Sequence, residues 1–485
     1  MTYQLLPFRF TRFPPGQELM TNEAGEFLFA STGTVERIVK RGITAGTDEY
    51  KDLLAKHIVV DDETVPLLDV LSTKLRTKKA HLGAGICLQL VVVTRRCNHL
   101  CRYCQTSRRP SVDSRYDMPK STIDNVVDAV IASSADSFTL EIQGGEPLLA
   151  MEGVKYLVEK AQRRAQAAKK EMSVVICTNL SLADDAFFAY CKHNEIAVST
   201  SLDGPLDLHN AYRELPGGNS YTLVRDKLTQ AISKLGVDRV SALMTTTRQS
   251  LRHGKRIVDE YVSLGLTHIF LRRLNAYGFA RNADVEMYSS EEFLNFYKEC
   301  LSYIIQRNKE GQNIVEVYTS ILLRKILTPF STGFVDLLSP PGMGISFMAY
   351  DYNGNVYPSD ESRMLSATGD ETFLLGNLLV DKIDAIVSNP RLKDIHYQAM
   401  AEGVPGCADC VFLPYCGSDP VHHYNTQHDM VGTKPSSTFC QINKGIFRFL
   451  FEKILGNDPD EMRVFWSWIR NTPIADIEGA LPGHD

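Results

Sequence analysis

The chain has 485 residues, which suffices for two or three domains with substantial hydrophobic cores. Its 44% hydrophobic and 23% charged residues are typical of a globular protein, and a formal net charge of −6 gives no reason to expect nucleic acid or an anionic membrane as a partner. With no run of 18 apolar residues and no secretory signal at its start, the sequence predicts a cytoplasmic protein without membrane spans.

The first 80 residues predict a small α/β unit that resembles a winged helix. Short β-like runs lie at 26–29 and 58–60, and helical stretches lie at 35–40 and 50–56. The segment 65–79 predicts a helix that ends in a basic linker.

Residues 85–328 predict a partial barrel, because strand-like apolar runs alternate there with helix-period segments. Six runs without a seventh or eighth indicate a partial (β/α)6 barrel rather than a closed eightfold one. Ligands of such folds bind at the C-terminal ends of the strands. The strand candidates are 87–93, 138–142, 173–177, 196–201, 240–244 and 269–272.

The rest of the chain predicts less regular structure. Two further helices are expected between 291 and 327. Residues 329–446 are rich in Gly, Pro and Ser and show little periodicity, so we expect a domain that needs a metal in order to fold. One amphipathic helix is expected at 447–468, and with the tail it makes a last segment, 447–485.

The eleven cysteines divide into two tight groups and four scattered residues. In a chain without an export signal, clustered cysteines indicate metal ligands rather than disulfides. The scattered four lie in apolar surroundings and are expected to be buried small hydrophobic residues: Cys87, Cys177, Cys191 and Cys300.

The first group, Cys97, Cys101 and Cys104, follows the first predicted strand with the spacing C-x3-C-x2-C. Three thiolates in eight residues can hold a [4Fe–4S] cluster and leave one iron without a protein ligand. In radical S-adenosylmethionine (SAM) chemistry that iron chelates SAM, which is cleaved to a radical that abstracts hydrogen from the substrate. The alternative is a zinc loop that borrows a fourth ligand, although zinc sites more often show paired C-x2-C knuckles.

Polar residues follow the second and third predicted strands. After the second come Gly144, Gly145 and Glu146: the glycines let the backbone approach a ligand closely, and the carboxylate can accept a hydrogen bond from the SAM ammonium. After the third come Thr178 and Asn179, which suit a ribose or a carboxylate. A Gly-Gly-Glu sequence alone would also fit an ordinary turn.

The fourth predicted strand is followed by Ser201, Asp203 and Arg213. Arg213 could clamp the SAM carboxylate, with Ser201 alongside and Asp203 facing the ribose. Taken singly, these residues also fit a plain turn and a solvated helix face. Their occurrence at successive strand ends favours the SAM site.

With these motifs, residues 85–445 resemble the radical SAM superfamily, and more narrowly its SPASM-containing, peptide-modifying branch. The resemblance implies that the residues named above contact SAM and that Tyr103 lies beside the adenine. It makes Arg272, at the end of the sixth predicted strand, a further candidate for the same pocket.

The second cysteine group predicts a closed site for a [4Fe–4S] cluster or for zinc, and spacing does not decide between them. Since four thiolates suffice, His422, His423 and His428 are expected to be surface residues rather than ligands. The four cysteines are Cys407, Cys410, Cys416 and Cys440.

The SPASM pattern of the family has seven cysteines that hold two auxiliary clusters. Here Ser359 and Pro420 stand at two of the cysteine positions, and 341–344 replaces a Cys-Gly-x-Gly. The resemblance therefore implies one auxiliary cluster instead of two. An aspartate that matches Asp360 takes a proton from the substrate radical in sulfatase-maturating relatives, and a solvated acidic turn is the alternative.

The segments 5–10, 21–27 and 357–361 resemble the radical SAM maturases of the His-Xaa-Ser system (HxsB type). This implies a ribosomally made precursor peptide as substrate, companion maturation proteins, and a flavodoxin or ferredoxin as electron donor. The N-terminal unit would add a leader peptide to a sheet edge as an extra strand, or else cap the barrel mouth.

Two other functions stay open. The same chemistry could act on a folded protein, as sulfatase-maturating enzymes do, or on a small molecule. In a function of another class, the chain would be a non-catalytic scaffold in which zinc holds the cysteine groups together.

Overall fold

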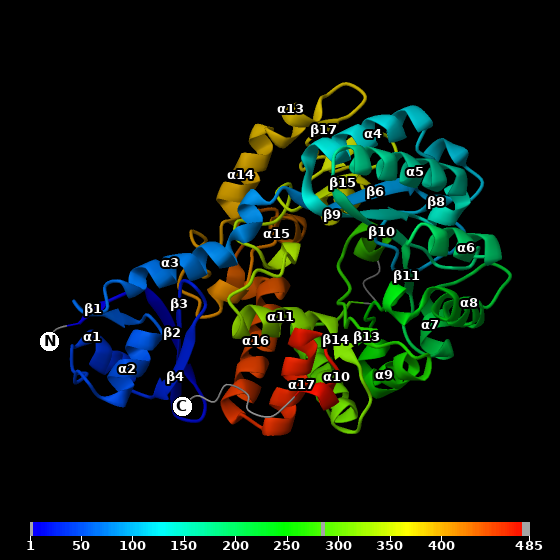
Figure 1. Cartoon of the computed structure of the whole chain (residues 1–485). Coiled ribbons are helices and arrows are strands. Elements are labelled where there is room, and N and C mark those ends of the chain that lie inside the picture. The colour runs from blue at the N-terminus through cyan, green and yellow to red at the C-terminus, as the bar shows by residue number, and fades with distance from the viewer. Residues whose placement is uncertain (1–2, 283–286, 478–485) are drawn as a thin grey trace. The chain divides into compact units, whose positions relative to one another are not determined.

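The computed structural model describes residues 3–282 and 287–477 (Figure 1). Its contacts divide the chain into two compact units, each made of segments that are distant in the sequence. The first, here the terminal unit, comprises Met1–Gly83, Thr319–Gly342 and His396–Phe465. The second, here the sheet unit, comprises Ala84–Tyr318, Met343–Ile395 and Trp466–Asp485.

An eight-stranded sheet organises the described part of the sheet unit, in the order β12-β11-β10-β9-β6-β15-β16-β17. All neighbours from β12 to β15 are parallel, and β16 and β17 add an antiparallel margin. The strands are β6 (Ile86–Thr94), β9 (Ser134–Gly144), β10 (Glu171–Cys177), β11 (Ala197–Ser201), β12 (Val240–Leu243), β15 (Phe347–Tyr350), β16 (Asn355–Tyr357) and β17 (Gly376–Asn377).

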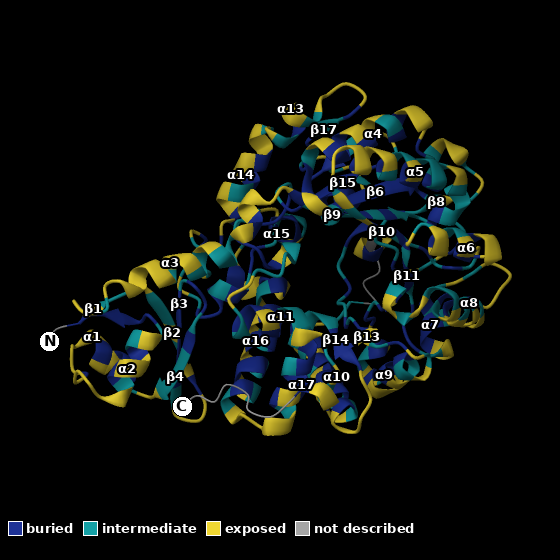
Figure 2. Cartoon of the chain, in the orientation of Figure 1, coloured by how far each residue is buried: buried dark blue, intermediate teal, exposed yellow. Residues whose placement is uncertain are grey.

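Amphipathic helices connect the parallel strands and lie on the outer side of the sheet (Figure 1). In α5, Val154, Leu157, Val158, Ala161 and Ala165 are buried at helical spacing, which explains why this segment packs on the sheet. Figure 2 shows the strands largely buried and the outward faces of α4, α5 and α6 exposed. The connecting helices are α4 (Lys120–Ser133), α5 (Met151–Ala167), α6 (Asp185–His193), α7 (Leu206–Tyr212) and α8 (Ser220–Leu235), and α9 (Gly254–Ser263) follows β12.

The first five predicted strands are confirmed, whereas the sixth differs. β13 (His268–Ile269) pairs with β14 (Val315–Glu316) and is not part of the eight-stranded sheet in the described residues. The sixth parallel strand is instead β15, which comes from the region that was expected to be irregular and whose four residues are all buried. The two predicted helices before it are α10 (Ser290–Lys309) and α11 (Val317–Leu327).

The N-terminal part of the terminal unit contains the predicted small α/β elements. Met20, Ile38 and Leu53 are fully buried in its hydrophobic core. An antiparallel sheet has the order β2-β3-β4, and β1 pairs with β5. The elements are β1 (Gln4–Leu5), β2 (Phe8–Phe13), β3 (Gln17–Asn22), β4 (Phe27–Ser31), α1 (Thr34–Val39), α2 (Asp48–Ala55), β5 (Val59–Val60) and α3 (Leu67–Lys78).

Residues 329–446 are more regular than expected, because four helices form there besides the strands: α12 (Asp360–Ser366), α13 (Ile383–Val387), α14 (Pro390–Ala399) and α15 (Pro420–Gln427). The single terminal helix predicted at 447–468 is wrong. Two helices occur, α16 (Thr438–Gly456) and α17 (Pro459–Arg470), because Asn457 adopts a left-handed conformation with φ of 44° and Pro459 begins a new helix. None of the helices in the described ranges is long and apolar enough to cross a bilayer.

Candidate active site

The cysteine loop, which follows β6, begins with the short strand β7 (Arg96–Cys97) and carries Cys97, Cys101 and Cys104. Backbone hydrogen bonds fasten it to the segment around the end of α7: the amide of Leu100 donates to the carbonyl of Glu214 at 2.7 Å, and Arg102 donates to Tyr212 at 3.0 Å. The three thiols are half-buried. A loop held at several points presents its side chains in a defined arrangement, as a cluster site requires.

The three thiols interact electrostatically. Burial raises the pKa of Cys97 and raises that of Cys101 to about 11, and neighbouring thiolates in the group add to both shifts. Cluster formation would reverse these shifts, because iron binds the thiolate form. Among the described residues, no three His, Cys, Asp or Glu side chains are arranged as a site for a single metal ion. Three sulfur donors on one loop nevertheless fit a [4Fe–4S] cluster with one open iron position.

Asn179, predicted from the end of the third strand, reaches the cysteine loop. Its amide nitrogen donates to the side-chain oxygen of Asn98 at 2.9 Å and lies 4.0 Å from the sulfur of Cys97. Asn98 in turn donates to Ser181 at 2.8 Å. The end of β10 and the cysteine loop are therefore joined by a polar network.

Two histidines that received no role from the sequence support the same loop. The hydroxyl of Ser220 lies 2.9 Å from Nε2 of His99 and 3.0 Å from Nε2 of His209. Burial lowers the pKa of His99 to about 4 and that of His209 to about 3, so both rings are neutral at pH 7. The position of His99 inside the cysteine motif is the signal that could have identified it.

The two glycines after β9 make close backbone contacts. A Cβ at Gly144 would lie 2.5 Å from the carbonyl oxygen of Thr94, and one at Gly145 would lie 2.3 Å from that of Arg96. These separations are too short for any side chain, so glycine is required for the end of β9 to pack against the end of β6. The approach seen here is to backbone rather than to a ligand, and an additional contact with SAM stays a prediction.

Glu146 is fully buried, and its carboxylate already accepts three hydrogen bonds. They come from the amide of Leu148 at 3.0 Å, the hydroxyl of Thr178 at 2.6 Å and the amide of Asn179 at 2.7 Å. Burial raises the pKa of Glu146, and these hydrogen bonds oppose the shift. Glu146 thus joins the ends of β9 and β10. The predicted contact with the SAM ammonium would come in addition to these three hydrogen bonds.

Asp203, Arg213 and Tyr103 form one buried cluster. Arg213 Nε donates to Asp203 at 2.9 Å, and the Tyr103 hydroxyl donates to the same carboxylate oxygen. The guanidinium carbon of Arg213 lies 5.4 Å from the centre of the Tyr103 ring. Three residues predicted to bind SAM are therefore brought together, although they are bonded to one another. Ser201 lies half-buried at the end of β11.

A further polar group includes Glu141 and Gln143, which share one face of β9, and Cys177 of β10. Gln143 donates to the Glu141 carboxylate at 2.5 Å. Burial raises the pKa of Glu141; Asp360 raises it further and Arg272 opposes the shift, so both charges lie near this carboxylate. Cys177 is not surrounded by apolar groups as expected, because its thiol bonds to Glu141. The polar alternation along β9 is the signal that could have revealed Glu141.

Asp360 begins α12 and accepts a hydrogen bond from Nε of Arg363 at 2.7 Å, and Nη2 of the same guanidinium forms an ion pair with this carboxylate at 2.7 Å. Arg363 is almost completely buried, with 1% of its side chain exposed, so the pair is shielded from solvent. The residue before it, Ser359, caps the helix by accepting a hydrogen bond from the amide of Ser362 at 3.1 Å. A serine at this cysteine position therefore has a structural reason.

The second cysteine group, here the auxiliary site, lines a single cavity in the terminal unit together with the rings of Phe412 and Phe447. Burial raises the pKa of Cys407 to about 11, and Lys434 opposes this shift. The four thiols that line the cavity are those of Cys407, Cys410, Cys416 and Cys440.

The helix α15 lies within the loop of the auxiliary site, and Pro420, the residue at another position where the SPASM pattern has cysteine, is its first residue. Two of its histidines are not surface residues as expected: His422 is 6% exposed and His423 is completely buried. Nε2 of His423 lies 2.8 Å from the hydroxyl of Ser437. The third, His428, is exposed as expected and ends the helix in a left-handed conformation.

Residues 91–260 match the family model of the Radical SAM superfamily, and this range contains the cysteine loop and the strand ends described above. The chain is a radical SAM enzyme. Its cofactors are accordingly SAM and a [4Fe–4S] cluster. The non-catalytic scaffold considered from the sequence is therefore wrong.

Relatives of this radical SAM enzyme include maturases. A cysteine-type anaerobic sulfatase-maturating enzyme of Clostridium perfringens is 23% identical over 368 residues, which cover 74% of this chain and 94% of the relative. The structure of native anSMEcpe with bound AdoMet has a TM-score of 0.62 at 18% identity and covers 76% of this chain and 98% of its own. Streptococcus suis SuiB bound to precursor peptide SuiA has a TM-score of 0.54 at 13% identity, covering 90% of this chain and 99% of its own.

In this radical SAM enzyme, we expect the substitution Asp203→Asn to lower the free energy of unfolding by about 3–5 kcal/mol, because Arg213 would keep a buried charge without its carboxylate. Chemical denaturation of the unloaded protein measures the change. Asp207→Asn is the matched control: its pair with Arg256 has the same 2.9 Å separation but is half exposed, so less than about 1 kcal/mol should be lost. Equal losses in the two variants would contradict the structural role of the buried pair.

Proposed function

We propose that this radical SAM enzyme abstracts hydrogen from a ribosomally made peptide, of the His-Xaa-Ser type, to install a modification. The observation that carries the proposal is the likeness of 90% of the chain to SuiB bound to its precursor peptide. A second neighbour, native anSMEcpe with bound AdoMet and a Kp18Cys peptide, aligns with 76% of the chain and a TM-score of 0.63. Both neighbours hold peptides, which supports a peptide substrate here.

In this proposal Cys97, Cys101 and Cys104 hold the SAM-binding cluster. When bound, the cluster and SAM supply one-electron reduction and a carbon radical strong enough to take hydrogen from an unactivated C–H bond. The protein's own part is to position SAM. Tyr103 would contact the adenine, Asp203 the ribose and Arg213 the carboxylate, with the remaining strand-end residues around them: Gly144, Gly145, Glu146, Thr178, Asn179, Ser201 and Arg272.

The four cysteines of the auxiliary site would hold one [4Fe–4S] cluster, with zinc as the alternative. The helix starts at Ser359 and Pro420 support a single auxiliary cluster, because these two of the three vacated cysteine positions have structural roles. A flavodoxin or ferredoxin would supply the electrons, and companion maturation proteins would complete the product.

The N-terminal unit offers a place where a leader peptide could bind. Within the described residues β2 is an edge of the three-stranded sheet, and Phe10 on it is 51% exposed. An extended peptide can add to such an edge through backbone hydrogen bonds, with pockets for its side chains giving specificity. The structural alternative is that this unit only covers another part of the protein.

Asp360 is the proposed proton acceptor, because oxidation of a substrate radical releases a proton. Arg363 holds its carboxylate in place, and Glu141 lies close enough to interact with it. We expect Asp360→Asn to keep peptide-independent SAM cleavage but to lower the rate of peptide modification by about tenfold to a hundredfold. Quantifying 5′-deoxyadenosine and modified peptide in the same reaction separates the two effects. The adjacent substitution Glu361→Gln is the control and should leave both rates within a factor of about two.

The proposed function is tested with two synthetic peptides, one bearing His-Xaa-Ser repeats and one copied from the cysteine site of a sulfatase. Each is deuterated on carbon and incubated without oxygen with reconstituted enzyme, SAM and dithionite. Deuterium in 5′-deoxyadenosine and a mass change in the His-Xaa-Ser peptide alone would support the proposal. Transfer of deuterium from the sulfatase peptide alone would favour a sulfatase-type maturase. If neither peptide transferred deuterium, a peptide substrate of these two kinds would be contradicted.

A further inference from the structure

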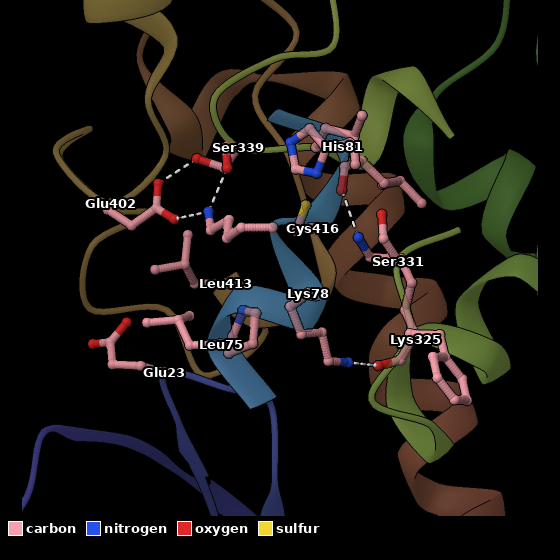
Figure 3. Close-up of a pocket in the computed structure, with 15 residues that line it drawn as sticks. Glu23, Leu75, Lys78, His81, Lys325, Ser331, Ser339, Glu402, Leu413 and Cys416 are labelled. Atoms are coloured by element: carbon pink, nitrogen blue, oxygen red, sulfur yellow. Dashed lines mark hydrogen bonds and ion pairs between the residues drawn. The ribbon is translucent and has the colours of Figure 1, made fainter. Parts of the chain in front are cut away.

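A second cavity in the terminal unit, here the lysine pocket, is lined by none of the residues assigned to SAM or substrate (Figure 3). It lies at the C-terminal end of α3 and is lined by Lys78, Lys79, His81, Lys325 and Cys416, among others. Three ammonium groups and an imidazole around one small cavity concentrate positive charge there. Its volume of about 30 Å³ accommodates roughly two water-sized groups.

The acidic side chains of the pocket do not neutralise all of its lysines. Glu402 pairs with Lys79, and Glu23 pairs with Arg9 at 3.0 Å. The hydrogen bonds of Lys325 and Lys78, in the part of the chain that the structure describes, go to main-chain carbonyls. Lys325 donates to Leu337 at 2.6 Å; Lys78 donates to the carbonyls of Lys325 and, at 3.0 Å, Thr328.

These bonds leave donors for a ligand. An ammonium group has three N–H donors, so Lys325 keeps two and Lys78 keeps one. Burial lowers the pKa of Lys78 to about 8, and the charge of Glu26 opposes this shift without cancelling it, so holding this cation here is costly. A bound anion would remove that cost.

His81 is the second, independent observation. It is 92% buried at the pocket, and neither ring nitrogen makes a hydrogen bond of good geometry in the described structure, although the carbonyl of Lys78 lies close enough to affect its pKa. A buried ring without hydrogen-bond partners is unfavourable unless a ligand bonds to it. If the lysines only served to bond the free carbonyls at helix ends, their positions would be explained, but the buried His81 without partners would not.

We propose that the lysine pocket binds one carboxylate, that of an aspartate or glutamate side chain of the peptide substrate. A carboxylate presents two oxygens to the donors of the pocket and carries a single charge. Lys325 and Lys78 would donate charge-assisted hydrogen bonds to these oxygens, and His81 would donate from one ring nitrogen. The peptide as the source of the carboxylate rests on the proposed function, but the anion site does not.

Saturation-transfer NMR on the reconstituted full-length enzyme tests this inference. The probes are acetate, acetamide, inorganic phosphate, and the N-acetylated pentapeptide amides Ala-Ala-Glu-Ala-Ala and Ala-Ala-Gln-Ala-Ala. Acetate and the glutamate peptide should bind to the wild type. Each of the substitutions Lys325→Met and His81→Phe should weaken the affinity for both probes at least about tenfold, because each removes one charge-assisted hydrogen bond. Lys74→Met is the control: Lys74 is on the same helix but is bonded to Glu26 and does not line the pocket.

Four results would overturn the inference, and three of them concern the binding of the probes. The glutamate and glutamine peptides could bind equally, Lys74→Met could weaken binding as much as Lys325→Met, or phosphate alone could bind. The lysines could instead balance the charge of the auxiliary site through Cys416. In that case Lys325→Met would change the electron paramagnetic resonance signal of the auxiliary cluster and leave acetate binding unchanged, which would also overturn it. Because no probe contains His-Xaa-Ser, the result is independent of whether that peptide is modified.

Discussion

Replacement of Cys97, Cys101 and Cys104 by alanine is expected to abolish formation of 5′-deoxyadenosine. The three thiols are the sulfur donors of the loop after β6, and without them the SAM-binding cluster has no protein ligand. We expect a loss of at least about a thousandfold, to the background of the assay. The measurement is anaerobic incubation of the iron-loaded proteins with SAM and dithionite, followed by chromatography of the nucleoside.

The control for this triple variant replaces cysteines outside both groups, Cys87→Ala with Cys191→Ala. This double variant should keep the iron content and SAM cleavage of the wild type, although removal of the buried Cys191 thiol should lower stability by about 1 kcal/mol. Product from the triple variant at the wild-type rate would show that the cluster is held elsewhere.

Loss of the auxiliary site is expected to uncouple SAM cleavage from peptide modification. With one [4Fe–4S] cluster in each site, the loaded wild type should contain about eight irons per chain, and the variant Cys407→Ala with Cys416→Ala about four. We expect peptide product to fall at least about tenfold, while SAM cleavage persists because the first cluster is intact. Iron and zinc analysis, together with both product assays, measures these effects.

Other metal contents would have definite meanings. About twelve irons per wild-type chain would contradict a single auxiliary cluster, and about four irons with one zinc would assign zinc to the auxiliary site. Unchanged peptide modification in the variant would show that the auxiliary site is not needed for the reaction. The matched variant is again Cys87→Ala with Cys191→Ala, which should keep about eight irons.

Local patterns predicted much of the fold, because they depend on near neighbours in the chain. The first five strands of the barrel and the helices between them follow from apolar periodicity, and the cysteine loop is placed directly after β6 as expected. The prediction of the sixth parallel strand is wrong because β15 pairs with β6, more than 250 positions away in the chain, and local patterns do not report such distant pairing. A four-residue apolar run such as Phe347–Tyr350 does not indicate which strand it will join.

The candidate site was harder to predict at the level of contacts. Its residues were brought near one another, but the sequence did not predict that Arg213 would be bonded to Asp203, since that depends on how α7 packs beside β11. Burial of His423 also depends on tertiary packing, and a histidine among prolines and glycines has no periodic pattern that would reveal it. In contrast, the alternation Thr139, Glu141, Gln143 on β9 contained a usable signal.

The tight packing of Gly144 and Gly145 against the end of β6 has a consequence for the evolution of such chains. A larger residue at 145 would displace the carbonyl of Arg96, one position before the first cysteine, and would therefore disturb the sheet whether or not a cluster is bound. A descendant that had lost its cysteines and its chemistry would still be selected to keep both glycines for folding. In a genome, the two glycines therefore indicate that the fold is kept. The cysteine triplet is what distinguishes an active enzyme from a relative that has lost the activity.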